Sequence, residues 1–151
     1  MLGTLSQEQI DQVLRSEVVG RIGLHADGRT YVVPITYAYD GAHIYGHSAV
    51  GMKIRMMREN PHVCFEVDYM DNLANWRSVI AWGVFEELHG DEATQAMRFL
   101  VDHLSPMMTS ETSQPSHGTT DSGGHRAETA GHEAVIYRVT LLEKTGRFEK
   151  R

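Results

Sequence analysis

Hydrophobic residues along much of this chain alternate with polar ones, which is the pattern of half-buried strands. In 60–68, for example, Val63, Phe65 and Val67 alternate with smaller or charged neighbours. Other stretches are rich in β-branched and aromatic residues, which also favour strands. The predicted strands lie at 31–39, at the start of 44–54, within 60–68, at 78–86 and at 134–143. The chain is therefore predicted to be mainly β.

Two helices are predicted outside these strands. Ser6 and Gln9 form the capping-box pattern of a helix start, and Leu5 and Ile10 stand at the positions of a hydrophobic staple. A second helix is predicted over 91–104, because apolar residues recur there every three to four positions. Its predicted buried face consists of Ala93, Met97, Leu100, Val101 and Leu104. Both helices are expected to pack against the sheet.

The segment 44–54 carries the strongest chemical signal. A strand pattern runs through a turn of small residues into a helix start, and Ser48 and Gly51 let the backbone approach a ligand closely. The first N–H groups of a helix have no intrahelical acceptors and attract anions, and Lys53 adds a positive charge. This combination is typical of a phosphate site. The alternative is that Ser48 only caps the helix and Lys53 is solvated, which is the simpler interpretation for the segment taken alone.

Pro34 lies in the middle of the predicted strand 31–39. Proline cannot donate a hydrogen bond to a neighbouring strand, so this strand must lie at a sheet edge or contain a break. In both cases nearby N–H and C=O groups are left for something other than a strand. The hydrogen-bonding edge of a flavin ring would fit them.

The order of these features resembles the pyridoxamine-phosphate-oxidase-like flavin-binding split barrels, and within them the branch of the nitroimidazole-resistance proteins. The resemblance covers about 5–88 and resumes at 134–149. It depends on the order of several short motifs: Val33-Pro34-Ile35, His47-Ser48 with Gly51 and Lys53, Asn60-Pro61 before 63–67, and Ser78-Val79 with Gly83. The family implies a six-stranded antiparallel split β-barrel with a few short flanking helices. It also implies a homodimer that binds FMN in clefts between the subunits.

The resemblance implies roles for residues on the ring side of the cofactor. The backbone of Val33, Pro34 and Ile35 is expected to face the isoalloxazine ring. His47 and Ser48 are expected to line the ring and the ribityl chain. An imidazole beside the flavin can transfer protons near neutral pH, so His47 is the candidate catalytic residue. A turn histidine that bonds only to backbone is an equal alternative for it.

The resemblance also implies a phosphate end and a contribution from the second subunit. Gly51 is expected to let the backbone approach the cofactor, and Lys53 is expected to contact the phosphate. Ser78, with Arg77 and Trp76 beside it, is expected to reach the cofactor from the partner subunit.

The chain departs from pyridoxamine phosphate oxidases proper. Those enzymes carry an arginine just before the segment matched by 32–35 and another beside the phosphate lysine. This chain has Tyr31 or Val32 at the first place and Met52 at the second. It also lacks their C-terminal substrate-binding arginine and tryptophan pattern, which argues against that particular reaction.

Composition fits a small single domain. The 151 residues, 41% of them hydrophobic, suffice for one core, so 1–151 is expected to be one domain. No apolar run approaches the roughly 20 residues that span a bilayer, and no signal-peptide pattern is present at the start. A cytoplasmic protein without membrane contact is therefore expected.

Cys64 is the single cysteine, which excludes an intrachain disulfide, and it is expected to be an inert core thiol.

The net charge of −6 argues against nucleic-acid binding, which needs a basic surface. Lys53, Arg55 and Arg58 still fall within one short predicted helix and can form a local basic pocket. Arg55 and Arg58 are expected to be solvated. Two alternatives stay open for Arg21, which either contacts the cofactor or pairs with a carboxylate.

Residues 109–131 contain no valine, leucine, isoleucine, methionine or aromatic residue. Such a segment cannot bury enough apolar surface to offset the entropy of ordering it, so a flexible loop rich in serine, threonine and glycine is predicted within the domain. His117, His125 and His132 lack the spacing of a ligand set, so no specific metal site is predicted.

Two functions of different classes fit the sequence. The first is an FMN-dependent oxidoreductase that reduces a small electron acceptor, such as a nitroimidazole. The second is a non-catalytic binding or sensing module that holds FMN, haem or another cofactor. His47 fits both, because a histidine can transfer protons beside a flavin or bind haem iron.

Overall fold

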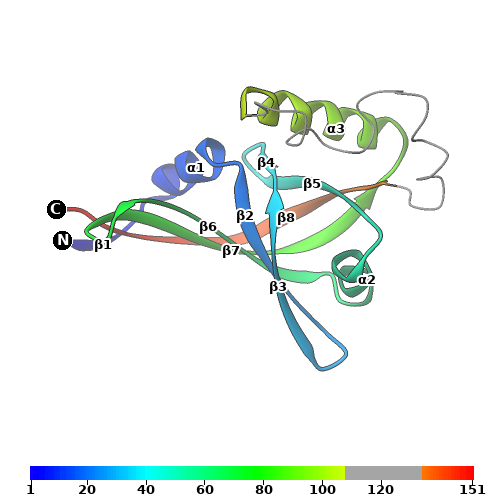
Figure 1. Cartoon of the computed structure of the whole chain (residues 1–151), viewed down its shortest axis with the longest axis horizontal. Coiled ribbons are helices and arrows are strands. Elements are labelled where there is room, and N and C mark those ends of the chain that lie inside the picture. Colours follow the sequence, from blue (N-terminus) through cyan, green and yellow to red (C-terminus); the bar gives the residue numbers. More distant parts are fainter. Residues whose placement is uncertain (108–133) are drawn as a thin grey trace.

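The computed structural model describes residues 1–107 and 134–151, and Figure 1 shows long strands in one curved sheet with helices packed around it. The predicted flexible loop 109–131 lies outside the described residues. The strands are β1 (Leu2–Thr4), β2 (Val19–Ala26), β3 (Arg29–Thr36), β4 (Ala38–Tyr39), β5 (His43–Ala49), β6 (His62–Asn72), β7 (Asn75–Leu88) and β8 (Ala134–Glu149). The helices are α1 (Gln7–Ser16), α2 (Met52–Glu59) and α3 (Gly90–Leu104), and a 3₁₀ turn (Ser105–Met107) follows α3.

Neighbouring strands in the sheet follow the order β3-β2-β6-β7-β8-β5-β4, and all described pairs are antiparallel. β1 pairs with the end of β8. The two outermost strands, β3 and β4, do not pair with each other, so the sheet curls without closing. The predicted antiparallel split barrel is confirmed. Its six long strands are joined by the short β1 and β4, which bring the total to eight.

The predicted strand 31–39 is divided in two by Tyr37. The N–H of Tyr37 donates to the carbonyl oxygen of Val18 at 3.0 Å, and its hydroxyl donates to the carbonyl oxygen of Leu14 at 2.8 Å. The side chain is fully buried, so the break anchors the chain in the core before β4 begins. β3 pairs only with β2, and the edge position that Pro34 predicted is confirmed.

Helix α1 begins as the capping box predicted. The hydroxyl of Ser6 accepts a hydrogen bond from the N–H of Gln9, and the side-chain oxygen of Gln9 accepts one from the N–H of Ser6. Ile10, Val13 and Leu14 are buried against the sheet. Each such side chain contributes about 1.5–3 kcal/mol by burial, so packing rather than intrinsic helix propensity holds α1 in place.

Helix α3 lies over β4, β5 and β8 (Figure 1). Its buried residues are Ala96, Leu100 and Leu104, whereas Ala93, Met97 and Val101 are only half-buried. Leu100 and Leu104 were predicted correctly, and Ala96 was missed. The helix touches the sheet along a narrower stripe than the predicted face. Within residues 1–107 and 134–151, no helix has the length and apolar character needed to cross a membrane.

Gly83 lies where the register of β7 and β8 shifts. A Cβ atom at this position would overlap the carbonyl oxygen of Thr140 and lie 2.8 Å from Cγ1 of Val139. We expect Gly83→Ala to lower the free energy of unfolding by about 3 kcal/mol, because a backbone atom cannot move aside as a flexible side chain can. The melting temperature should fall by about 6–12 °C in differential scanning calorimetry.

Gly23→Ala is the matched control for this substitution. Gly23 is also a strand glycine, but its Cβ would come no closer than 3.7 Å to the carbonyl oxygen of Cys64. Its melting temperature should stay within about 2 °C of the parent protein, in line with a change of about 0.5 kcal/mol. Equal melting temperatures for the two variants would contradict the overlap at Gly83.

Candidate functional site

The split of the barrel leaves two strand edges without strand partners. β3 pairs with β2 alone, and β5 pairs with β8 over its whole length but with β4 only at Ile44 and Tyr45. Among the described residues, one edge of β3 and one edge of 46–49 therefore carry backbone groups that no strand uses. In the β4–β5 pairing, Ala38 lies opposite Tyr45. When the same register is counted back along the chain into β3, Ile35 falls level with Ser48. Both free edges thus border the same split.

Helix α2 begins at the end of β5 and brings Lys53 to this region. Gly51 is the N-cap of α2 and supplies no capping side chain, so the first N–H groups of the helix keep their donor capacity. Burial lowers the pKa of the half-buried Lys53 ammonium. No carboxylate lies within ion-pair distance of Lys53 in the part of the chain that the structure describes. A half-buried cation without an anion is typical of a site that binds an anionic ligand.

Ser48 does not cap α2. Its hydroxyl donates to the carbonyl oxygen of Ala49 at 2.8 Å, and the cap position belongs to Gly51. The alternative interpretation of Ser48 as a helix cap is therefore wrong. At the other side of the split, a guanidinium nitrogen of Arg29 approaches the sulfur of Met52 to 4.0 Å, so the start of β3 lies beside the start of α2.

His47 and Ser48 point to opposite faces of β5. Side chains alternate along a strand, and the buried Ile44 and Gly46 mark the inner face, to which Ser48 also belongs. His47 shares the other face with Tyr45 and lies opposite Ile136 of β8. The two residues can therefore line one ligand only if that ligand meets the edge of β5, which is the edge left free at the split.

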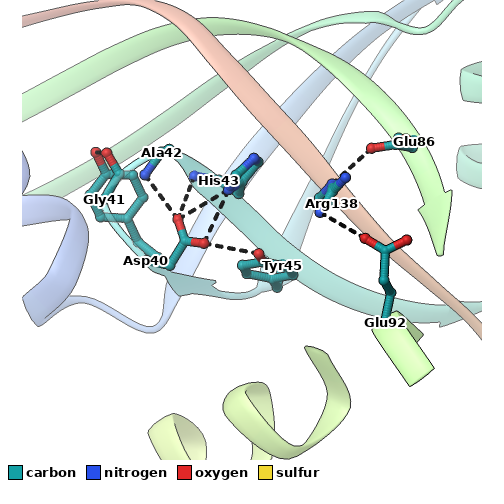
Figure 2. A network of polar contacts seen from close by, with 9 residues as sticks. Asp40, Gly41, Ala42, His43, Tyr45, Glu86, Glu92 and Arg138 are labelled. Carbon is teal, nitrogen blue, oxygen red and sulfur yellow. Dashed lines mark hydrogen bonds and ion pairs between the residues drawn. The ribbon is translucent and has the colours of Figure 1, made fainter. Parts of the chain in front are cut away.

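The face of β5 that carries His47 is held by a polar network (Figure 2). Asp40 accepts hydrogen bonds from the N–H groups of Ala42 and His43 at 2.9 and 2.7 Å and from the hydroxyl of Tyr45 at 2.9 Å. Its Oδ2 also lies 3.0 Å from Nδ1 of His43. Burial alone would raise the pKa of Asp40, but these contacts outweigh it and lower the pKa. The network fixes the turn between β4 and β5. It therefore also fixes the place where the split ends.

Arg138 ties this region to α3 (Figure 2). Its Nε donates to Glu86 at 2.7 Å, and its Nη1 donates to Glu92 of α3 at 3.4 Å. The Tyr45 ring meets the Phe99 ring edge-on with centroids 5.6 Å apart. These contacts position α3 over β5. No local pattern predicted them, since the partners are distant along the chain.

Trp76, Arg77 and Ser78 lie far from the split within one chain. Ser78 stands opposite Arg147 and His47 stands opposite Ile136, so they are separated by the length of β8 from 136 to 147. At about 3.3 Å per residue, the path along β8 between these two positions is roughly 36 Å. Trp76 and Arg77 instead border a separate groove of about 360 Å³ beside α1. A single chain does not bring these residues to the other predicted site residues.

Arg21 pairs with a carboxylate. This is one of the two roles that the sequence analysis left open for it, the other being contact with the cofactor. Its Nη1 lies 3.6 Å from Oε1 of Glu66, and both side chains remain partly exposed. Burial, together with the neighbouring carboxyl group of Asp68, raises the pKa of Glu66 to about 7. Sequence reasoning missed this pair, although acids two positions apart on a predicted strand share one face.

Arg58 and Cys64 differ from their expected environments, and Arg55 does not. Arg58 is not merely solvated, because it forms an ion pair with Glu87, whereas Arg55 is exposed as expected. Cys64 is half-buried on the outer face of β6 and is not a core residue. Burial raises the pKa of its thiol, which disfavours the reactive thiolate.

The open antiparallel barrel, with a helix start at its split, defines a protein of the split-barrel class. The chain belongs to the pyridoxamine 5'-phosphate oxidase family, whose family model matches residues 6–148.

Solved structures and a curated relative resemble the chain. A FAD-binding protein (mll6688) from Mesorhizobium loti is 30% identical with a TM-score of 0.78, and the match covers 100% of this chain and 98% of that one. A candidate 5-nitroimidazole antibiotic resistance protein from Bacteroides thetaiotaomicron shares the fold, with 18% identity, a TM-score of 0.69 and coverage of 98% and 89%. Uncharacterized protein RA0666 of Rhizobium meliloti (strain 1021) is 34% identical over 84 residues, and this match spans only 56% of each chain.

Proposed function

We propose that this chain binds a flavin nucleotide, FMN, at the split between β3 and β5 and is a cytoplasmic flavoprotein. The observation that carries the proposal is Lys53, a half-buried cation in the first turn of α2 without a described carboxylate partner. A phosphate group is the natural anion for it, because the uncapped N–H groups of α2 lie next to it. The flavin named for the Mesorhizobium loti protein supports the same ligand class.

The free strand edges suit the remainder of a flavin. An isoalloxazine ring presents both acceptors and a donor along one edge, and in the proposed site it faces the free edge of β3 at Val33, Pro34 and Ile35. Backbone groups of successive residues point to opposite edges of a strand, so the carbonyl group of Pro34, which has no N–H, and the backbone groups of its two neighbours lie at opposite edges of β3. Ser48 and Gly51 complete the region between ring and phosphate. In this arrangement the chain's own residues bind and orient the cofactor, and His47 holds a proton on the outer face of β5.

We further propose that two copies of the chain form the complete site. Trp76, Arg77 and Ser78 lie about a strand length away from His47 in one chain, so they can approach the flavin only from a second copy. A homodimer with a cofactor cleft at each end of its interface would satisfy both sets of residues.

The bound flavin would supply redox chemistry, and the proposed activity is reduction of a small acceptor such as a nitroimidazole. The resistance protein that shares the fold motivates this acceptor class by analogy. The second candidate is a module that holds FMN or haem without turnover. It is favoured by the small number of proton-transfer groups at the split, where His47, Ser48 and Lys53 are the ionisable or hydroxyl side chains among the predicted site residues that border it.

Flavin binding is tested by titrating the purified protein with FMN, FAD and riboflavin while flavin fluorescence is recorded. We expect FMN to bind at least about tenfold more tightly than riboflavin, because a charge-assisted phosphate contact contributes about 1.5–3 kcal/mol. Equal affinity for FMN and riboflavin would contradict a phosphate site. The absorption spectrum of protein purified without added cofactor distinguishes flavin from haem, and a haem spectrum would favour the second candidate.

A further inference from the structure

The turn between β2 and β3 fixes the position of Arg29. Asp27 and Gly28 form a two-residue loop with φ angles of 53° and 74°, and two positive φ angles in succession are typical of a type I′ hairpin turn. Ala26 and Arg29 are the cross-strand pair that borders this loop. Arg29 is therefore the first residue of β3, and the turn sets its register.

The side chain of Arg29 lies on the core-facing side of β3. Residues directly opposite each other in an antiparallel pair share one face of the sheet, and Ala26, the partner of Arg29, is buried. The alternation along β3 agrees with this, because Tyr31 and Val33 follow at two and four positions and pack against the core. Arg29 occupies the rim of this face and stays exposed.

Two contacts hold this hairpin against α2, and Figure 1 shows the hairpin extending past that helix. At the end of α2, the side-chain nitrogen of Asn60 donates to the carbonyl oxygen of His25 at 2.7 Å. At the start of α2, Nη1 of Arg29 lies 4.0 Å from the sulfur of Met52. A thioether sulfur is a weak acceptor, so this contact positions the guanidinium and leaves its charge uncompensated. Met52 is the residue directly before Lys53.

Arg29 and Lys53 lack a described counter-ion although carboxylates are in excess. The chain has 20 acidic and 14 basic residues, and Arg21, Arg58 and Arg138 each pair with a carboxylate. Within residues 1–107 and 134–151, neither Arg29 nor Lys53 forms such a pair. Two neighbouring cations repel each other, and an anion bound between them is attracted by both.

We propose that Arg29 is a second cation of the phosphate site and that it favours FMN over FAD. The proposal rests on the proposed function, because that function places a flavin phosphate beside Lys53. FMN ends in a phosphate monoester, and such a group carries a charge of about −1.5 to −2 at pH 7. In FAD the same phosphate is bonded to a second phosphate and carries one charge. Two cations on one phosphate therefore favour FMN.

The place of Arg29 along β3 suits the phosphate end of this ligand. The proposed ring contacts are at Val33, Pro34 and Ile35, on the same strand and further along the chain. Arg29 lies at the other end of β3, beside the start of α2. A planar guanidinium binds two phosphate oxygens at once, and its position beyond Lys53 would cover the oxygens that FMN leaves free and FAD does not.

The test is fluorescence titration of Arg29→Ala with FMN, FAD and riboflavin. We expect the FMN dissociation constant to rise about tenfold, because one charge-assisted contact is lost. That of FAD should rise less than about threefold, as for an exposed ion pair, and that of riboflavin should change less than about twofold. Arg29→Lys keeps the charge without the planar donor pair, so its FMN affinity should fall between those of Arg29→Ala and the parent.

Arg98→Ala is the matched control. Arg98 is an exposed arginine of α3, so its removal changes the net charge equally and should change FMN affinity less than about twofold. Without ligand, the melting temperature of Arg29→Ala should stay within about 2 °C of the parent's, because Arg29 is exposed. A loss of FMN affinity then reports on binding and not on unfolding.

The outcomes separate this proposal from the proposed function. A parent that binds FMN and riboflavin equally would refute the phosphate site itself, and the role of Arg29 with it. If Lys53→Ala loses the preference for FMN over riboflavin and Arg29→Ala keeps it, the phosphate site stands and the role of Arg29 is overturned. A loss in Arg29→Ala that is larger for FAD than for FMN would also overturn it, since the guanidinium would then contact the second phosphate.

Discussion

Replacing His47 by alanine should slow reoxidation of the reduced, flavin-loaded protein by a nitroimidazole about 100-fold. General acid–base assistance typically contributes 10²–10⁴-fold, and His47 is the imidazole at the free edge of β5. FMN affinity should change much less, because the proposed binding groups are backbone atoms and Lys53. The measurement is anaerobic stopped-flow absorbance of the flavin after mixing with acceptor.

His43→Ala is the matched control for this effect. His43 lies on the same face of β5, but its Nδ1 is engaged by Asp40 at 3.0 Å, and it stands four positions from His47. Its reoxidation rate should stay within about threefold of the parent. If His47→Ala reoxidises at the parent rate, the histidine has no part in the mechanism. If the parent itself shows no turnover across nitro compounds and quinones, the non-catalytic binding module is favoured.

Replacing Lys53 by alanine should weaken FMN binding about 10- to 100-fold and leave riboflavin binding nearly unchanged. The ammonium group is half-buried, and burial already lowers its pKa, so a bound phosphate would gain a partly desolvated partner. Loss of one charge-assisted contact costs about 1.5–3 kcal/mol. Fluorescence titrations with both ligands give the two dissociation constants, and equal losses for both would show that Lys53 does not contact the phosphate.

Arg55→Ala controls for general loss of positive charge from α2. Arg55 is exposed two residues further along the same helix. Arg55→Ala should change FMN affinity less than about threefold at 0.15 M salt, where exposed charges are screened.

Without ligand, Lys53→Ala should not be less stable than the parent in thermal unfolding, because it removes a half-buried charge that no described carboxylate compensates. A large loss of stability would indicate a structural role for Lys53.

Local sequence signals predicted the elements whose causes are local. The capping box of α1 depends on only two residues, Ser6 and Gln9, and the structure contains both of its hydrogen bonds. Pro34 likewise predicted an edge strand, because its missing N–H is a property of the residue itself. The break at Tyr37 was not predicted, since it depends on hydrogen bonds to Val18 and Leu14 that exist only after the chain folds.

The candidate site was predicted less completely than the fold. The segment from Ser48 to Lys53 does join a strand end to a helix start, but the cap is Gly51, and the alternation of β5 turns His47 away from Ser48. That alternation was readable from the sequence. The distance of Ser78 from His47 was not, because it depends on which strands lie next to β8.

Strand β8 has a consequence for how the chain folds. It is the strand that connects β7 to β5, so without it the remaining long strands would form one sheet of β3, β2, β6 and β7, and β4 and β5 would stand apart as an isolated hairpin. Such a hairpin is at best marginally stable in water. Because β8 follows all these strands in sequence, and its pairing with β1 joins Leu2 to Glu149, the ribosome releases most of the chain before the barrel can form. Bringing these distant segments together costs conformational entropy before their contacts form. Refolding should therefore take milliseconds to seconds. During this time the edges of β5 and β7 are open to pairing with other chains.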